Sequence, residues 1–191
     1  MVAMDDDTPQ QPRLAPALLL SMPQLIDPNF RRTVVLLCEH SPDGAWGLVL
    51  NRPTGKRAAA VVDLDPPVVR DSGLEVWVGG PVEPPRGCLL LPEEPPGEDV
   101  FEVSPHVFIS SSGDLLRRLI EGPGVANARL LMGYAGWGPG QLDRELTESS
   151  WLISDVATDI VFHTKPAEMW EAAIRRLGVD PAALQTSSGV H

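Results

Sequence analysis

Cysteine is scarce in this chain of 191 residues, which contains only Cys38 and Cys88, and the two do not form a CxxC pair. Structural zinc sites and disulfide-stabilised small domains need more cysteines at characteristic spacings. The sequence therefore predicts no metal site and no disulfide framework. Two thiols without such a pattern favour a reducing compartment.

Long hydrophobic runs are also missing. No stretch approaches the ~20 consecutive apolar residues that a membrane-spanning helix requires. The apolar run at residues 14–20 is interrupted by Pro16, and the segment before it is acidic where a secretory signal is basic. We therefore expect a soluble, cytoplasmic protein without a signal peptide and without a membrane partner.

Positive charge is in deficit, because 15 Lys and Arg residues face 26 Asp and Glu residues, which gives a formal net charge of −11. Proteins bind nucleic acids largely through Lys and Arg side chains that displace counterions from the phosphates. The basic residues of this chain occur in short groups with acidic residues between them. The sequence therefore argues against direct binding to nucleic acid.

The composition is that of a folded protein, with enough hydrophobic residues for one core. Residues 1–13 combine aspartates with Gln and Pro, and residues 185–191 are small and polar, so both segments are predicted to be frayed tails. We expect a single domain over residues 14–184.

Short apolar runs bounded by Gly, Pro and Asp predict a protein with more strands than helices. The expected strands are residues 17–22, 33–40, 46–51, 75–79, 87–91, 106–110, 129–135, 151–154 and 159–162. Pro42, Asp43 and Gly44 are typical turn residues, and they predict a hairpin between the second and third strands.

Helices are expected after Ser112 through Ile120, at residues 141–149 and at residues 166–177, with a last turn that starts at Asp180. Strands that follow one another quickly, with helices mostly later, do not form the regular alternation of a doubly wound sheet. The predicted class is therefore α+β, with a mixed, largely antiparallel sheet.

Glycine is concentrated in residues 133–141, where four glycines surround Trp137 and lead into a predicted helix. Unpaired backbone N–H groups at the start of a helix can bind an anion, which makes Trp137, Gly138 and Gln141 candidate ligand-binding residues. The segment lacks the GK[ST] and GxGxxG patterns of nucleotide-binding loops, so no cofactor is predicted. The alternative, which we favour, is a tight turn whose Trp137 packs on the sheet.

Two strand ends are further candidates for the mouth of a pocket. Asn51 and Arg52 follow one predicted strand, and Gly79 and Gly80 end another. The alternative is turn chemistry, in which glycine sets the backbone, asparagine caps it and arginine solvates the loop.

Cys38 and His40 are the weak candidates for catalysis. In a regular strand they share one face, with Glu39 on the other, and their Cα atoms lie about 6.5 Å apart. A thiol nucleophile with an imidazole base is one interpretation. The alternative, which we favour, is that Cys38 is a small buried hydrophobic residue, because it ends the apolar run VVLLC.

Three segments together resemble the AlgH/YqgE family of bacterial proteins: residues 21–55 (SMPQLIDPNF through LNRPTG), residues 76–82 (VWVGGPV) and residues 133–152 (GYAGWGPGQLDRELTESSWL). The resemblance spans residues 18–178, with the departure that Ser149 and Ser150 precede Trp151 where family members commonly carry Asn. It implies a split, partly open β-barrel with helices packed outside, and it transfers no catalytic residue. Family members are often labelled transcriptional regulators.

Three functions follow from these observations. The first is a non-catalytic binding or regulatory protein that holds an unknown small molecule or protein partner beside Trp137. The second is a thiol-dependent enzyme that uses Cys38. The third is a transcriptional regulator, which the net charge disfavours as a direct DNA binder.

Overall fold

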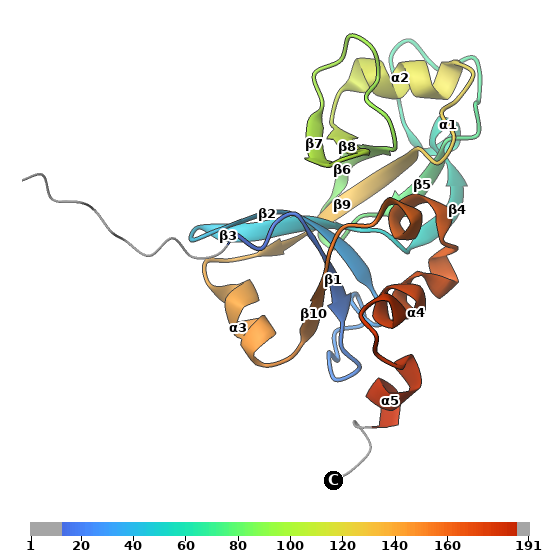
Figure 1. Cartoon of the computed structure of the whole chain (residues 1–191). Coiled ribbons are helices and arrows are strands. Elements are labelled where there is room, and N and C mark those ends of the chain that lie inside the picture. The colour runs from blue at the N-terminus through green and yellow to red at the C-terminus, as the bar shows by residue number, and fades with distance from the viewer. Residues whose placement is uncertain (1–12, 187–191) are drawn as a thin grey trace, which may run out of the picture.

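A computed structural model describes residues 13–186 and shows an α+β protein built on one curled, largely antiparallel sheet that forms a half-barrel (Figure 1). The strands are β1 Ala17–Ser21, β2 Val34–Ser41, β3 Gly44–Val49, β4 Pro53–Arg57, β5 Glu75–Val78, β6 Val82–Leu91, β7 Phe101–Ser104, β8 Val107–Ser110, β9 Arg129–Trp137 and β10 Trp151–Ser154. The helices are α1 Ala58–Val61, α2 Gly113–Glu121, α3 Gln141–Thr147, the π-helix η1 Asp159–His163, α4 Pro166–Arg176 and α5 Pro181–Thr186. The predicted fold class is confirmed.

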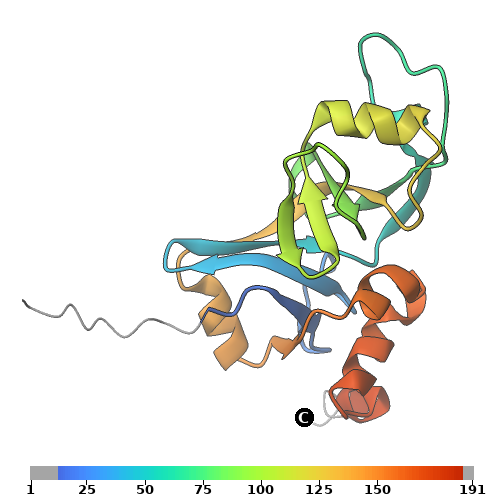
Figure 2. The same cartoon turned by 45° about the horizontal axis from the view of Figure 1, so that its top comes forward.

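The long strand β9 joins two halves of the sheet. The strand order is β10-β1-β2-β3-β9-β6-β8-β7, with β5 also on β9 and β4 on β5. Residues 129–132 of β9 pair with β5 in parallel and with β6 antiparallel, whereas residues 135–137 pair with β3. One half therefore contains β1, β2, β3 and β10, and the other contains β4 to β8, as Figure 2 shows from above.

Helix α4 covers one face of the β1–β3 half. Pro166 occupies its first turn, where its missing N–H costs nothing, and Met169, Trp170, Ala173 and Ile174 form its buried face. These side chains pack in one core cluster with Leu18 and Leu20 of β1 and Leu36 of β2. The indole of Trp170 also donates to the carbonyl oxygen of Ser21 at 2.8 Å, which fixes the helix on β1.

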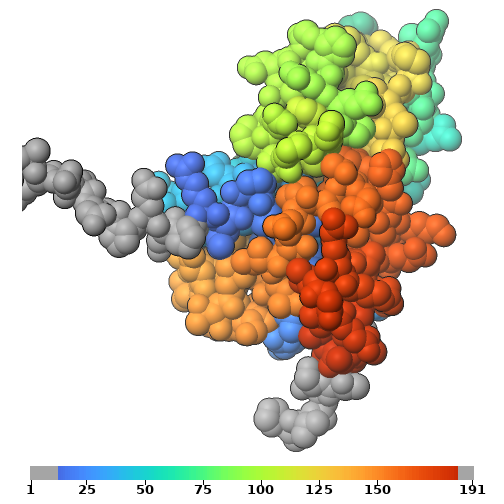
Figure 3. Space-filling view, viewed as in Figure 1, coloured from blue at the N-terminus to red at the C-terminus, as the bar shows by residue number. Residues whose placement is uncertain are grey.

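Helix α2 covers the other half. The Ser112 side chain caps its N-terminus by accepting a hydrogen bond from the backbone N–H of Leu115 at 3.1 Å. Leu115, Leu119 and Ile120 then pack with apolar residues of β6, β8 and β9 in a second core cluster. In the space-filling view the β7–α2 region (green to yellow) borders the C-terminal region (orange to red) (Figure 3).

Most of the predicted elements are present, and the β2–β3 hairpin and helices α2, α3 and α4 are confirmed. The strand predicted at 159–162 is wrong, because this segment is the π-helix η1. Ile160, Val161 and Phe162 are all buried, and a short fully apolar run has the same pattern in a buried helix and a buried strand.

The prediction also missed three elements, α1, β4 and β7. Strand β4 is exposed along its whole length and so carries no apolar alternation. The tails predicted at 1–13 and 185–191 lie outside the described residues, apart from Arg13 and the last two residues of α5.

Candidate functional site

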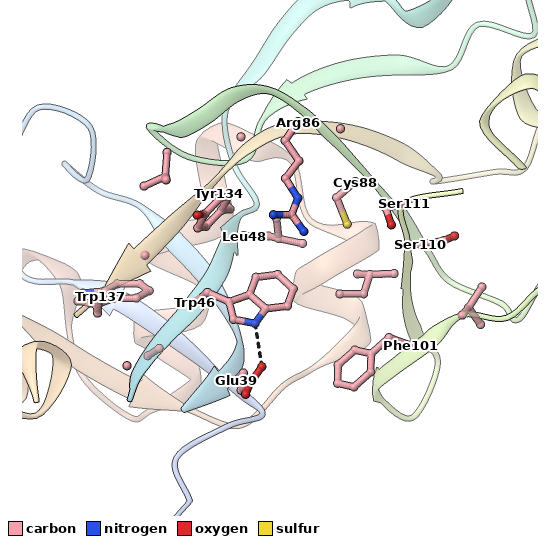
Figure 4. Close-up of a pocket in the computed structure, with 18 of the residues that line it drawn as sticks. Glu39, Trp46, Leu48, Arg86, Cys88, Phe101, Ser110, Ser111, Tyr134 and Trp137 are labelled. Carbon is pink, nitrogen blue, oxygen red and sulfur yellow. Dashed lines mark hydrogen bonds between the residues drawn. The ribbon is translucent and has the colours of Figure 1, made fainter. Parts of the chain in front are cut away.

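An open cleft of about 1200 Å³ lies between the β2–β3 hairpin, the middle of β6 and β9, and the segment from β7 to the start of α2. The side chains of Trp46, Tyr134, Phe101 and Arg86 project toward this space (Figure 4). They come from four different strands or strand connections. The cleft is therefore a product of the curled sheet rather than of one loop.

The pairing of β3 with β9 positions the first aromatic wall. Trp46 lies opposite Gly136, which has no side chain to cover the indole, and Trp46 donates its Nε1–H to Glu39 Oε2 at 3.1 Å. The Tyr134 ring meets the Trp46 ring edge to face, with 6.5 Å between the centroids. These contacts fix both rings in position while leaving each partly exposed.

Phe101 and Arg86 complete the walls. The Phe101 side chain belongs to the edge strand β7 and is 54% exposed, an unusual position for a large apolar ring. The Arg86 guanidinium lies 5.7 Å from the centroid of the Tyr134 ring, a cation–π distance. Carboxylates of Glu39, Asp43 and Asp99 also line the cleft.

The thiols beside this cleft are poor nucleophiles at neutral pH. Cys88 lines the cleft, and burial raises the pKa of its thiol from 9.0 to about 11, although Ser110 and Arg86 oppose that shift. Cys38 does not line the cleft and is buried in the core cluster beneath α4. Burial raises the pKa of its thiol far above the ordinary range, with smaller contributions from Cys88 and Glu39. Since the thiolate is the reactive form, neither cysteine is activated.

The structure separates Cys38 from His40, so the expected shared face is wrong. The pairing of β2 with β3 shifts between Leu37 and Glu39, which is a β-bulge at Cys38. Cys38 packs in the α4 core cluster, whereas His40 pairs with Ala45 of the opposite cluster. The Cys38 thiol donates to the Leu36 carbonyl oxygen, and His40 Nε2 lies 3.3 Å from Asp143 Oδ2.

Trp137 lies at the end of β9, and its indole is committed to contacts inside the protein. It packs edge to face against Trp151, with 5.9 Å between the centroids, and stacks on Phe30. Its Nε1–H donates to Glu145 Oε2 at 3.0 Å. Part of Trp137 still lines the cleft.

The other residues of the glycine-rich segment start helix α3. Gly140 precedes the helix with a left-handed backbone (φ +67°), and the Gln141 side chain accepts a hydrogen bond from the Gly138 backbone N–H at 3.0 Å. The backbone N–H groups of Gly138 and Gln141, two of those considered for anion binding, therefore already have partners inside the protein. Neither Gly138 nor Gln141 lines the cleft.

The two strand ends also lie away from the cleft. Asn51 is buried, accepts from the Val34 backbone N–H and donates to the Arg32 carbonyl oxygen, while the Arg52 guanidinium donates to Thr33 Oγ1 at 2.9 Å. Both tie the end of β3 to the start of β2.

Gly79 and Gly80 lie where the chain passes directly over β9. A Cβ atom at Gly79 would overlap the Gly133 carbonyl oxygen, and one at Gly80 would overlap the Tyr134 backbone. Of the seven predicted binding residues, Trp137 alone lines the cleft among the residues the structure describes.

Sequence reasoning missed the residues that form the cleft, namely Trp46, Arg86, Phe101 and Tyr134. Tyr134 is the single tyrosine of the chain, and Arg86 follows two prolines, but neither signal identifies a partner. Within residues 13–186, no three His, Cys, Asp or Glu side chains gather as a metal site. In the same range, no helix has the length and apolar character needed to cross a membrane.

Comparisons with known proteins agree with the fold. A family model described as AlgH-like matches residues 18–182. A UPF0301 protein of Myxococcus xanthus is 41% identical over 181 residues, which cover 93% of this chain and 98% of that protein. A UPF0301 protein of Paracoccus denitrificans is 39% identical over 188 residues, with coverages of 94% and 98%.

Two solved structures are similar as well. The solution structure of the AlgH protein from Pseudomonas aeruginosa is 36% identical, covers 98% of this chain and 100% of that one, and has a TM-score of 0.75. A crystal structure of a Corynebacterium diphtheriae protein, 22% identical with coverages of 94% and 93%, has a TM-score of 0.68 and supports the fold alone. By sequence along nearly its whole length, the chain belongs to the AlgH-like (UPF0301) family.

Proposed function

We propose that this protein is a non-catalytic, cytoplasmic binding protein that holds a small organic ligand with a flat apolar part in the cleft. The observation that carries the proposal is the convergence of Trp46, Tyr134 and Phe101 on one open space. Ligand sites in proteins are concave, mostly apolar and aromatic, and contain a few polar groups that orient the ligand.

The charge of the cleft favours a ligand that is neutral or positively charged. Glu39, Asp43 and Asp99 contribute three carboxylates, against the single guanidinium of Arg86. Arg86 is partly neutralised, since it lies 3.2 Å from Glu83. A cationic or neutral ring system would stack on the aromatic residues without repulsion from the carboxylates.

The same charges support a function that does not involve direct contact with DNA. A net charge of −11 repels phosphates, and the lining of the cleft contains more carboxylates than cations. A regulatory role for the protein would then act through the ligand or a protein partner. The high thiol pKa values of Cys38 and Cys88 support a non-catalytic role.

Screening by ligand-observed NMR tests this proposal, with a set of aromatic fragments that includes neutral, cationic and anionic members. We expect neutral and cationic fragments to bind the native protein. With Phe101→Ala we expect most of this binding to be lost. The matched control is Ile26→Ala, which truncates another exposed apolar side chain, 93% exposed and outside the cleft. Fragments that bind Phe101→Ala as well as the native protein, or a set with no binders, would contradict the proposal.

A further inference from the structure

A second cavity of about 590 Å³ shares no lining residue with the cleft. Its walls come from β5, from the connection between α2 and β9, and from the segment that joins η1 to α4. Its volume falls in the range of ordinary metabolite sites.

Arg129, the first residue of β9, lines this cavity and is only 6% exposed. Its guanidinium lies 4.3 Å from the centroid of the Trp77 ring and 5.9 Å from that of Phe162. Within residues 13–186 its side chain makes one hydrogen bond, a long one of 3.4 Å to the Leu50 carbonyl oxygen, and no ion pair. Four of the five N–H donors of the guanidinium thus lack an acceptor there.

Burying a guanidinium with so few hydrogen-bond partners lowers the stability of the folded protein. A buried charge is normally paired, because removal from water is not repaid by apolar neighbours. Burial lowers the pKa of Arg129 to about 10, with a smaller opposing effect from Glu75. The ring contacts offset part of the cost, but they supply no oxygen for the N–H groups.

Two further polar atoms in the walls of this cavity lack partners. Trp77 Nε1 and Ser72 Oγ are both buried, and neither forms a hydrogen bond with the described residues. Native proteins leave few buried polar groups unpaired, and each such group calls for an explanation, of which a bound partner is one. Two unpaired side-chain atoms and one guanidinium with a single long hydrogen bond therefore lie in the walls of one cavity.

The rim adds positive charge. Exposed Lys165 supplies it, with its ammonium 3.9 Å from Glu168 Oε1, and it precedes helix α4 without capping it through its side chain. Exposed His163 lies beside it in the lining. The positive end of the dipole of this 11-residue helix therefore faces the rim. Glu75 is the one carboxylate of the lining, and it is exposed.

We propose that this second cavity binds an organic carboxylate, with the carboxylate on Arg129 and the apolar part of the ligand against Trp77, Phe162 and Leu119. A planar carboxylate accepts two parallel hydrogen bonds from a guanidinium, which supplies the missing acceptors. The apolar walls favour a ligand with a hydrocarbon or aromatic body over a bare inorganic anion. This site is separate from the cleft and does not depend on the function proposed for it.

Titration with benzoate tests the proposal, with benzamide as its neutral isostere, inorganic phosphate as the bare anion and chloride to match ionic strength. The readout is the set of indole N–H signals in ¹H–¹⁵N spectra, with Trp77 assigned from Trp77→Phe. We expect benzoate to shift the Trp77 signal and to raise the melting temperature, benzamide to do neither, and phosphate to bind more weakly than benzoate.

Variants separate binding from folding. Arg129→Met should weaken benzoate binding about tenfold or more, and Lys165→Gln, which alters an exposed side chain and leaves the core intact, about twofold to fivefold. Arg176→Gln, an exposed arginine outside the cavity, is the matched control and should have no effect. Equal binding of benzamide, stronger binding of phosphate, no benzoate binding at high-millimolar concentration, or benzoate binding unaffected by both Arg129→Met and Lys165→Gln would each overturn the proposal.

Discussion

Trp137 donates its indole N–H to Glu145 Oε2 at 3.0 Å, and this bond joins the end of β9 to helix α3. Trp151 of β10 donates to the same oxygen at 2.8 Å, so a single carboxylate holds two tryptophans. Gln141 donates to the other oxygen at 2.9 Å. Three hydrogen bonds to one carboxylate therefore hold together the end of β9, helix α3 and the start of β10.

Replacing Glu145 should reveal this role. In Glu145→Leu two indole N–H groups lose their acceptor, and we expect the free energy of unfolding to fall by about 3 kcal/mol. Chemical denaturation followed by tryptophan fluorescence measures the change. Glu148→Leu, at an exposed position just after α3, is the control and should change stability by less than about 0.5 kcal/mol. Equal losses in the two variants would contradict this role.

Gly79 should tolerate no side chain. A Cβ atom there would overlap the Gly133 carbonyl oxygen in β9, and because backbone atoms cannot rotate away, we expect Gly79→Ala to cost about 3 kcal/mol. Gly113→Ala is the control, since a Cβ at this first residue of α2 meets nothing within 4 Å. Thermal denaturation of the two variants checks the prediction, which fails if Gly79→Ala melts like the native protein.

The two cysteines should react slowly in the folded protein. With a pKa of about 11, Cys88 has about a hundredfold less thiolate at pH 8 than a thiol of ordinary pKa 9.0. Buried Cys38 should react only when the protein unfolds. Iodoacetamide labelling followed by mass spectrometry measures both rates. His40→Ala should leave the labelling rate at Cys38 unchanged. A large fall of that rate in the variant would instead support the interpretation that His40 activates the Cys38 thiol.

Stability should fall as the pH rises through the alkaline range. The unfolded thiol of Cys88 ionises near pH 9.0, whereas the folded thiol stays protonated until about pH 11, so ionisation stabilises the unfolded state relative to the folded state as the pH rises between these values. Once the thiol is fully ionised in both states, the free energy of unfolding has fallen by about 3 kcal/mol. Denaturation curves at several pH values should show a shallower loss for Cys88→Ser than for the native protein. Parallel losses would show that this thiol does not contribute.

Sequence patterns succeed where local chemistry decides the structure. Pro166 and the apolar residues that follow it define helix α4, and the turn at Pro42 and Asp43 defines the β2–β3 hairpin. They fail where the tertiary structure decides. Exposed β4 becomes a strand because β5 pairs with it, and the buried run at 159–162 has no periodicity to separate helix from strand.

The candidate sites were still harder to predict from the sequence. The bulge at Cys38 leaves no mark in the apolar pattern of β2, yet it decides on which face of the strand His40 lies. Trp46, Tyr134 and Phe101 are far apart along the chain and meet only because the sheet curls. In the sequence, Arg129 stands out only as a charged residue directly before an apolar run. That its guanidinium has no carboxylate partner among the described residues is visible only in the fold.

Strand β9 has one more consequence, because its backbone hydrogen bonds are divided between the two halves of the sheet. Neither half can come apart without breaking bonds that the other half needs to keep its shape. We therefore expect a single cooperative denaturation transition, in which the packing around α2 and that around α4 are lost together.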